Sequence, residues 1–395
     1  MSMTFGVDSR RRGLARRNSL SNAVMGGKSA AVLVAVLLAA VSACSAGQPA
    51  DSGQSTTSAA SPAPADVAGS VWVADEGGDS LTVLDAATNT VTTTLTGLPG
   101  PHNVQVGGDG ATVYASSSSD TVVAIDAATY RVTASAATGP EPAHVIEAPN
   151  GKIYVANSGD GTVSVYQTPT LQPVGRIDVG GMPHGLRAAA DGSVIVVANH
   201  MAGAVDLIDP RTDRMLGAVP VGEGPAQVAV TADGRYAYTG TTQPPAVVKV
   251  DLNARKVVGI VAVSASPVQL YLTPDGATVV SADQGTREAP GHAASLIDTA
   301  TMTVRAAVRT GAGPHGVVID RAGMRAWVTD SYDNAVSVID LASQTVAATV
   351  AVGDEPNGIS YSTRPPAASA ATIALNIPAP AVDRTEPPPP HPWHG

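Results

Sequence analysis

The feature that most constrains the fold of this chain is a proline that recurs at an almost constant interval. Each copy follows a Gly-containing turn, and the set is Pro101, Pro142, Pro183, Pro225, Pro267, Pro314 and Pro356. Successive copies are 41, 41, 42, 42, 47 and 42 residues apart. Self-similarity at such a period is typical of repeat architectures. We therefore interpret residues 70–363 as a tandem array of one structural unit.

Each unit contains four short β-strands separated by turn residues. In the unit that starts at Pro314, β-branched alternation predicts strands at 317–319, 325–329, 335–340 and 345–352. No stretch of about 12 residues in the array combines helical apolar spacing with an absence of turn residues. Four antiparallel strands in about 40 residues are typical of a β-propeller blade.

The number of blades follows from counting the two parts of the unit. The opening strand occurs seven times, and the trio of later strands also occurs seven times, the first trio starting at Val71. Because the chain enters and leaves the array within a unit, the strand from Asn357 to Tyr361 should become the innermost strand of the first blade. We predict an all-β, seven-bladed β-propeller of four-stranded antiparallel blades over residues 70–363, closed by the N- and C-terminal strands in one blade.

The segment before the array has the pattern of an export signal. Six basic side chains within residues 10–28 precede an apolar run at 30–41, which is shorter than the ~20 residues that span a bilayer. Small residues then precede Cys44, and this junction resembles the bacterial lipobox, in which the thiol is acylated and the chain is cut before it. We predict a lipoprotein signal peptide at 1–43 and a lipidated cysteine with a flexible linker at 44–69. An ordinary secretory cleavage site is the alternative.

The net charge and the cysteine count restrict which partners the protein can bind and how it can attach to a membrane. A net charge of −10 argues against nucleic acid, which requires a basic face, and against adsorption to anionic lipid. Acyl groups on Cys44 are then the only membrane contact, and we expect a monomer anchored in the cell membrane and facing outside the cytoplasm (periplasm or cell surface). The single cysteine excludes a disulfide framework and a Cys-based zinc cluster. The Pro-rich residues 364–395 are predicted to be a disordered or polyproline-like tail.

The repeats themselves resemble a known family. The strings IYVANSGDGTVSVYQ and AWVTDSYDNAVSVIDLASQTV, each followed by Val-Gly and a proline, are similar to YVTN-type repeats. The resemblance covers about three quarters of the chain. It implies a seven-bladed propeller on a bacterial or archaeal cell surface or in the periplasm. Such repeats are specific for the fold and carry little information on function.

Polar residues gather at two repeated positions that a propeller places on one face. The first group follows the recurring proline and comprises His102, His144, His184, Gln227, Gln269, His315 and Asn357. The second group ends each second strand and comprises Asp75, Ser117, Asn157, Asn199, Thr241, Asp283 and Asp330. We predict that this loop face and the channel mouth form the ligand-binding surface.

The histidines of the first group suggest a metal site. His102, His184 and His315 directly follow their prolines, whereas His144 comes one residue later. Since neighbouring strand residues point to opposite faces, we expect His144 to lie apart from the other three. Those three could bind a divalent transition metal through neutral imidazole. The favoured alternative is structural: each ring bonds the backbone of a neighbouring blade and recurs because the unit was duplicated.

Two further features have structural interpretations. An aspartate at the end of the third strand recurs as Asp85, Asp126, Asp209, Asp251, Asp298 and Asp340. We expect it to cap the following turn by accepting backbone N–H groups. The 47-residue unit has five extra residues, which lengthen a loop carrying Arg287, Glu288 and His292 on the predicted binding face. Such an insertion is either a specificity loop or tolerated drift.

We predict a binding or interaction module for a protein or small molecule, and we assign no catalytic residue. The alternative is a metal-assisted lyase or a lactonase-like hydrolase that uses the propeller-face histidines. Pro-His-Gly at Pro183 and at Pro314 resembles streptogramin lyases, whose face histidines work with magnesium, but this chain lacks their aromatic strand ends. Lactonase-type propellers use carboxylate, Arg and amide groups, and no clear carboxylate set is present. No nucleotide or redox cofactor is implied, and a divalent metal ion is the one cofactor considered.

Overall fold

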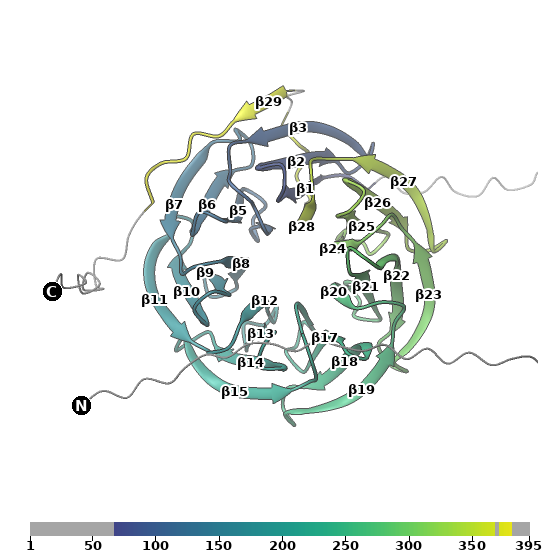
Figure 1. Ribbon diagram of the computed structural model, residues 1–395. Helices are drawn as coiled ribbons and strands as arrows, with labels where there is room; N and C mark the ends of the chain where they lie inside the picture. Colours follow the sequence, from purple (N-terminus) through teal and green to yellow (C-terminus); the bar gives the residue numbers. More distant parts are fainter. Residues whose placement is uncertain (1–66, 368–370, 381–395) are drawn as a thin grey trace, which may run out of the picture. The chain divides into compact units, whose positions relative to one another are not determined.

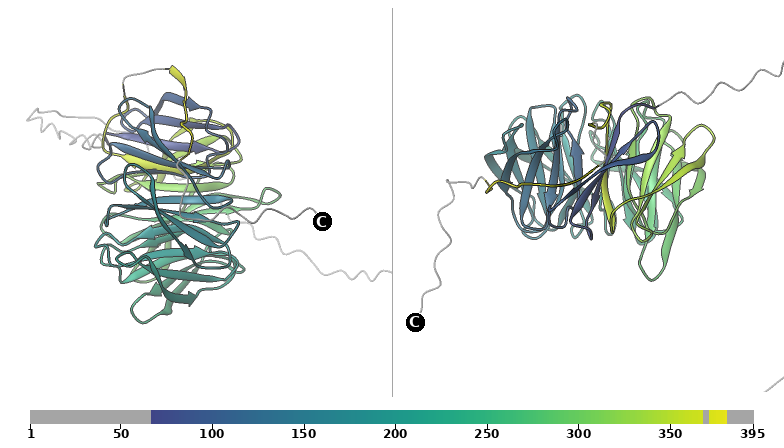
Figure 2. Two further views of the ribbon diagram at one scale, coloured as in Figure 1. Left: turned by 90° about the vertical axis from the view of Figure 1, so that its left-hand side faces the viewer. Right: turned by 90° about the horizontal axis from the view of Figure 1, so that it is seen from above.

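The computed structural model describes residues 67–367 and 371–380. Within them every regular element is a β-strand, and the strands form seven sheets arranged around a central axis (Figure 1). Side views show the sheets packed face to face around the ring (Figure 2). The predicted all-β, seven-bladed propeller is confirmed. The predicted signal peptide, Cys44 and the linker up to residue 66 lie outside the described residues, and no helix in the described part is long and apolar enough to cross a membrane.

Six blades are each made of four consecutive antiparallel strands, which succeed one another from the axis outward. The first two are β4 (Val104–Val106), β5 (Thr112–Ser117), β6 (Thr121–Asp126) and β7 (Val132–Ala137), then β8 (Pro142–Ala148), β9 (Lys152–Asn157), β10 (Thr162–Gln167) and β11 (Gln172–Asp178). The next two are β12 (Pro183–Ala188), β13 (Ile195–Asn199), β14 (Ala204–Asp209) and β15 (Arg214–Pro220), then β16 (Val228–Val230), β17 (Tyr236–Thr242), β18 (Pro245–Asp251) and β19 (Lys256–Ala262). The last two are β20 (Pro267–Leu272), β21 (Thr278–Gly285), β22 (Pro290–Asp298) and β23 (Thr303–Arg309), then β24 (Pro314–Ile319), β25 (Arg325–Asp330), β26 (Ala335–Asp340) and β27 (Thr345–Ala351).

The seventh blade joins the two ends of the array. Its strands, from the axis outward, are β28 (Pro356–Ser362), β1 (Ser70–Asp75), β2 (Ser80–Asp85) and β3 (Thr90–Thr96). The last strand of the array pairs antiparallel with the first, with Ser70 opposite Ser362 and Asp75 opposite Pro356. The predicted closure in one blade is therefore confirmed.

A fifth strand on this blade corrects the prediction for the C-terminal tail. Within the stretch 364–395, which we expected to be disordered or polyproline-like, β29 (Ala371–Ala374) pairs parallel with β3 (Figure 1). The physical reason is local composition: Ile373, Leu375 and Ile377 alternate between prolines and pack on the core under β3. A composition averaged over the whole tail hides that alternation. Residues 381–395 lie outside the described part of the chain.

The hydrophobic core is divided into seven clusters, each between two neighbouring blades. Because each blade is covered on both faces, its middle strands are buried almost throughout, unlike a half-exposed sheet. Two tryptophans anchor the clusters beside the closing blade. Trp72 meets Tyr130 edge-on at 5.6 Å between ring centroids, and Trp327 stacks on Tyr361 at the same separation.

The aspartates that end the third strands cap turns, as predicted. Asp85 Oδ1 accepts the N–H groups of Ala87 and Thr88 at 2.8 and 3.0 Å, and the aspartates of five other blades accept turn N–H groups in the same way. The turn then needs a residue with positive φ four positions after the aspartate, such as Asn89 at 55°. The carboxylate contacts hold the turn in that otherwise unfavourable conformation.

Candidate functional site

The turn after each recurring proline offers two successive positions from which a side chain can face the channel. Between Pro142 and Val145 the inner strand has one residue more than its partner strand, and the same bulge separates Pro183 from Leu186. A bulge breaks strict alternation and can re-aim a side chain. The first positions are His102, Ala143, His184, Ala226, Val268, His315 and Asn357, and the second positions are Asn103, His144, Gly185, Gln227, Gln269, Gly316 and Gly358. In six of the seven turns a long polar side chain at one position is matched by a small or apolar one at the other.

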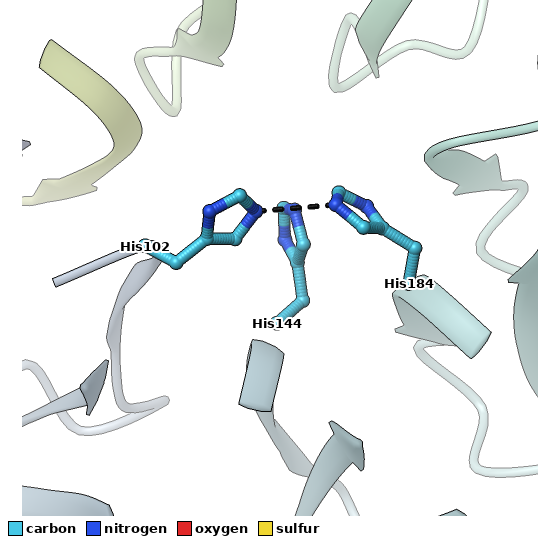
Figure 3. A group of neighbouring side chains, drawn as sticks. All are labelled: His102, His144 and His184. Carbon is cyan, nitrogen blue, oxygen red and sulfur yellow. Dashed lines mark hydrogen bonds between the residues drawn. The ribbon is translucent and has the colours of Figure 1, made fainter. Parts of the chain in front are cut away.

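Three histidines from adjacent blades converge on the axis (Figure 3). The ring centroid of His102 lies 5.5 Å from that of His144 and 5.0 Å from that of His184, and the remaining pair is 5.1 Å apart. One nitrogen of each ring lies within 4.8 Å of the other two. The expectation that His144 lies apart was wrong, because the bulge allows both turn positions to face the channel.

His315 takes a different place from the one expected. Its ring centroid is 6.4 Å from that of His102, and it does not belong to the convergent group. Its Nδ1 faces the amide nitrogen of Gln269 at 3.4 Å. Of the predicted metal set His102, His184 and His315, the structure brings the first two together and adds His144 instead of His315.

His102 is oriented by a carboxylate. Its Nδ1 lies 3.2 Å from both oxygens of Glu76, which also accepts a hydrogen bond from the Asn357 amide. Burial opposes ionisation of Glu76, but hydrogen bonds from His102 and Asn357, and the charge on His102 when that ring is protonated, outweigh it and lower the Glu76 pKa to about 2. Since a carboxylate only accepts, His102 Nδ1 carries a proton and a neutral ring presents a lone pair at Nε2.

His184 is held in the same tautomer by a backbone carbonyl. Its Nδ1 donates to the oxygen of Ala226 at 2.9 Å, so its Nε2 also presents a lone pair. The two Nε2 atoms of His102 and His184 face each other at 3.2 Å. Burial, with a contribution from His102, lowers the pKa of His184 to about 3, which keeps this ring neutral. At this distance a proton on one of the two nitrogens makes a hydrogen bond to the other, and two neutral rings would present both lone pairs to a shared cation.

His144 is the third histidine of the group and lies beside His102 and His184. It is 1 % exposed, and its Nδ1 lies 3.0 Å from the amide nitrogen of Gln227. Gln227 Oε1 accepts the Val228 N–H at 2.8 Å, which fixes the amide nitrogen toward the ring. Gln227 reaches His144 through the space that a side chain at Gly185 would fill. Among the described residues, His144 Nε2 has no hydrogen-bond partner.

A cavity of about 270 Å³ opens beside the three histidines on the loop face. Its lining is Glu76, Gly100, His102, Ser118, Glu141, Pro142, Ala143, Ser158, Met182 and His184. Two histidines of the group and the carboxylate that orients one of them therefore face a space large enough for a small ligand. An ion held by the rings would be reachable from this cavity.

The predicted residues at the ends of the second strands are buried within their own blades. Asn157 donates to Thr162 and Ser164, and Asn199 donates to Asp206. Asp283 and Asp330 accept hydroxyl groups in the same way, from Ser295 and Ser337 among others, and Asp75 does so from Ser80 and Thr82. None of these polar side chains lines the cavity beside the histidines. Their contacts support a structural role.

The inserted loop between β21 and β22 contacts the neighbouring blades. Arg287 forms an ion pair with Glu355 and lies over the ring of Tyr332, 4.7 Å from its centroid. The loop is on the predicted face, but none of its residues lines the cavity beside the histidines.

Glu76 is the functional residue that the sequence reasoning missed. We favoured a structural role for the histidines because no carboxylate partner was evident in their own turns. The partner comes from the preceding blade, directly after Asp75 at the end of β1. In a propeller this turn lies beside the proline turn of the next blade, so its position was available from the predicted topology.

Comparisons with known proteins support the fold. A family model described as YNCE-like beta-propeller matches residues 100–278. No curated protein gives a significant match. Among solved structures, hydrazine synthase of Kuenenia stuttgartiensis shares 22 % identity (67 % of this chain, 90 % of that one, TM-score 0.60). A protein of unknown function from Desulfotomaculum acetoxidans shares 13 % identity, and the match covers 75 % of this chain and 100 % of that one with a TM-score of 0.66. A candidate 6-phosphogluconolactonase from Bacteroides fragilis shares 18 % identity, and the match covers 76 % of this chain and 100 % of that one with a TM-score of 0.63. These similarities are to the fold alone, and the chain is a seven-bladed β-propeller.

Proposed function

We propose that this protein is a metal-binding β-propeller that holds one divalent transition-metal ion on its axis through His102, His144 and His184 and uses it to bind a small molecule or protein at the loop face. The observation that carries the proposal is the pair of opposed Nε2 atoms of His102 and His184, 3.2 Å apart, with His144 beside them. Neutral imidazoles favour zinc, copper, nickel or cobalt over magnesium or calcium, which prefer oxygen ligands.

The distance between the Nε2 atoms of His102 and His184 supports a shared ion, and the nitrogen of His144 lies within 4.8 Å of both. Nitrogen atoms bound to zinc at about 2.0–2.1 Å with tetrahedral angles lie about 3.3 Å from each other. The 3.2 Å separation of the two Nε2 atoms is close to that value. The partners of the other ring nitrogens also support the proposal, because metal-binding histidines usually donate their second N–H to a carboxylate or a backbone carbonyl. Glu76 and the Ala226 carbonyl are such partners.

The third histidine must change its tautomer to bind the ion. With Gln227 donating to Nδ1, the neutral ring of His144 carries its proton on Nε2. Binding through Nε2 moves this proton to Nδ1 and requires the amide oxygen of Gln227 to turn toward it. The competing explanation for the site is a proton shared between His102 and His184. A shared proton leaves the buried Nε2 of His144 without a partner among the described residues. A metal ion would give that nitrogen a partner once the ring has changed its tautomer.

Metal analysis of protein purified without an affinity tag tests the proposal. We expect the wild type to retain about one equivalent of zinc or copper after incubation and dialysis, and the double variant His102→Ala, His184→Ala to retain none. His292→Ala removes an exposed histidine outside the group and should bind like the wild type. A wild type that takes up none of zinc, copper, nickel or cobalt would refute the metal site.

A metal-assisted hydrolase or lyase is the second candidate. Three protein ligands leave a position open on a tetrahedral ion, where a bound water can be activated. The cavity beside the histidines gives a substrate access to that position. Turnover separates the two candidates, because an enzyme converts the molecule it captures whereas a binding protein releases it unchanged. The double histidine variant should lose turnover in the first case and only capture in the second.

For location, we propose a monomer exported from the cytoplasm and anchored by acyl groups on Cys44. The proposal rests on the basic segment, the short apolar run and the single cysteine of the sequence. We expect Cys44→Ser to move the protein from the membrane fraction to the soluble fraction. Ser45→Ala, next to the anchor, should leave it in the membrane, and retention of the Cys44→Ser variant would contradict acyl anchoring.

A further inference from the structure

An arginine on the inner strand β12 lies in the channel and connects three blades. Arg187 Nη1 donates to the side-chain oxygen of Gln105 at 2.8 Å, and the guanidinium carbon lies 5.4 Å from the ring centroid of Tyr271. Gln105 belongs to β4 and Tyr271 to β20, so this one side chain bridges three different blades. Each of the three residues comes four positions after a recurring proline, further along the strands than the histidine turns.

Within the described part of the chain, no carboxylate neutralises this guanidinium. The ion pairs within 4.0 Å among residues 67–367 and 371–380 do not include Arg187. Burial lowers its pKa, but a guanidinium stays protonated under all ordinary conditions. Of its five N–H donors, one has an acceptor among the described residues. The side chain is half-buried, and none of its nitrogens is both sealed from solvent and unpartnered, so the remaining donors are open to an anion in the channel.

The side chain opens into a cavity of about 670 Å³. Its lining includes Arg187, Asp233, Tyr236, Tyr271 and Asp275, together with residues of the turns that follow β12, β16 and β20. The turns in this lining connect first to second strands, whereas the histidines precede the first strands. The cavity therefore lies at the end of the channel opposite the three histidines.

We propose that this end of the channel binds an organic molecule with a single carboxylate, which the Arg187 guanidinium holds. The planar fork of arginine matches a carboxylate in a two-point hydrogen bond. Tyr271 lines the cavity and offers aromatic surface for an uncharged body, whereas the ring of Tyr236 is in contact with Arg235 and Lys249. Asp233 and Asp275 line the same cavity and disfavour a second negative charge, so a dianion such as phosphate should bind less well.

This site shares no residue with the metal centre and does not rest on the proposed function. Ligand binding is therefore measured on protein treated with a chelator, which keeps the two proposals separable. We expect titration calorimetry to show binding of benzoate, weaker binding of acetate, and at least tenfold weaker binding of inorganic phosphate and of the neutral analogue benzamide. If neither acid binds, or if phosphate binds more tightly than both, the proposal is overturned.

Two variants, Gln105→Glu and Arg187→Met, test whether Arg187 binds the carboxylate. Gln105→Glu places a carboxylate beside the guanidinium without changing the shape of the side chain, and it should weaken benzoate binding at least tenfold because the charge is then paired internally. Arg187→Met should remove binding. Arg214→Met changes the net charge equally on the exposed outer strand β15 of the same blade and should bind benzoate like the wild type. Unchanged benzoate binding by Gln105→Glu would place the acid elsewhere.

Discussion

Glu76→Gln and Gln227→Glu are expected to change the affinity of the axial site for zinc in opposite directions, each by about 10–100-fold. Both changes keep the shape of the side chain and exchange a carboxylate with an amide. Glu76→Gln removes the negative acceptor that holds the proton on Nδ1 of His102. The variant ring is then free to carry its proton on Nε2, where the ion must bind, so affinity falls.

Gln227→Glu should raise the affinity for zinc through its effect on His144. In the wild type the amide N–H of residue 227 donates to Nδ1 and leaves the ring proton on Nε2. A carboxylate at this position can accept a proton from Nδ1 and can still accept the Val228 N–H. The lone pair of His144 Nε2 then faces the other two rings without any rearrangement. Affinity should rise.

Competition titrations with a zinc chelator measure both shifts. Gln269→Glu is the matched control, because Gln269 makes the equivalent contact to His315, which lies outside the convergent group. We expect this variant to bind zinc like the wild type. A shift of both test variants in the same direction would show that the tautomers of His102 and His144 do not govern the site.

Replacing Asp75 and Asp330 by asparagine is expected to stabilise the protein by about 6 kcal/mol at pH 7.5 and to have almost no effect at pH 3.5. Burial is the main cause that raises the pKa of each carboxyl from 3.8 to about 6. Each shift of about two units corresponds to about 3 kcal/mol. The two groups lie in separate blades, so their effects should add.

The sign follows from proton binding by the two states. Between pH 3.8 and 6 the folded protein holds a proton on each of the two carboxyls, whereas the unfolded chain does not. Stability from these groups is therefore greatest below pH 3.8 and is lost as the pH rises through 6. Asparagine keeps the neutral form at all pH values. Asn157 already occupies the matching position in another blade and donates to hydroxyls at the same spacing, so the replacement fits the site.

Buried histidines change stability in the opposite direction. The pKa values of His184 and His315 are lowered to about 3, chiefly by burial, so below their ordinary value of 6.5 the unfolded chain binds protons that the folded protein does not. Both the wild type and the aspartate variant should therefore lose the same amount of stability from these histidines as the pH falls below 6.5. The difference between the urea midpoints of variant and wild type, measured with a chelator from pH 3.5 to 7.5, isolates the carboxyls. If the difference between the urea midpoints did not change with pH, the raised pKa values of Asp75 and Asp330 would be contradicted.

The fold could be predicted from the repeat. The candidate site could be predicted only in part, because it depends on residues that depart from the repeat. The recurring prolines and the incomplete first and last units are enough to predict seven blades and their closure, because blade number follows from counting. The strand β29 was missed because its alternation covers only seven residues of a Pro-rich tail. His144 was misplaced because alternation assumes a regular strand, and a bulge is set by the pairing with the next strand. Glu76 was missed because its partner is distant in sequence.

The closure between β1 and β28 affects the order in which the molecule can form. Ser70 pairs with Ser362, so two neighbours of one ladder are 292 positions apart in the chain. A ribosome that has finished six blades has still not made the strand that completes the first one. The ring can lock only after residue 362 has been made, which makes closure the last pairing of the array and one with high contact order. Until then the inner edge of β1 remains open to pairing with a strand of another chain.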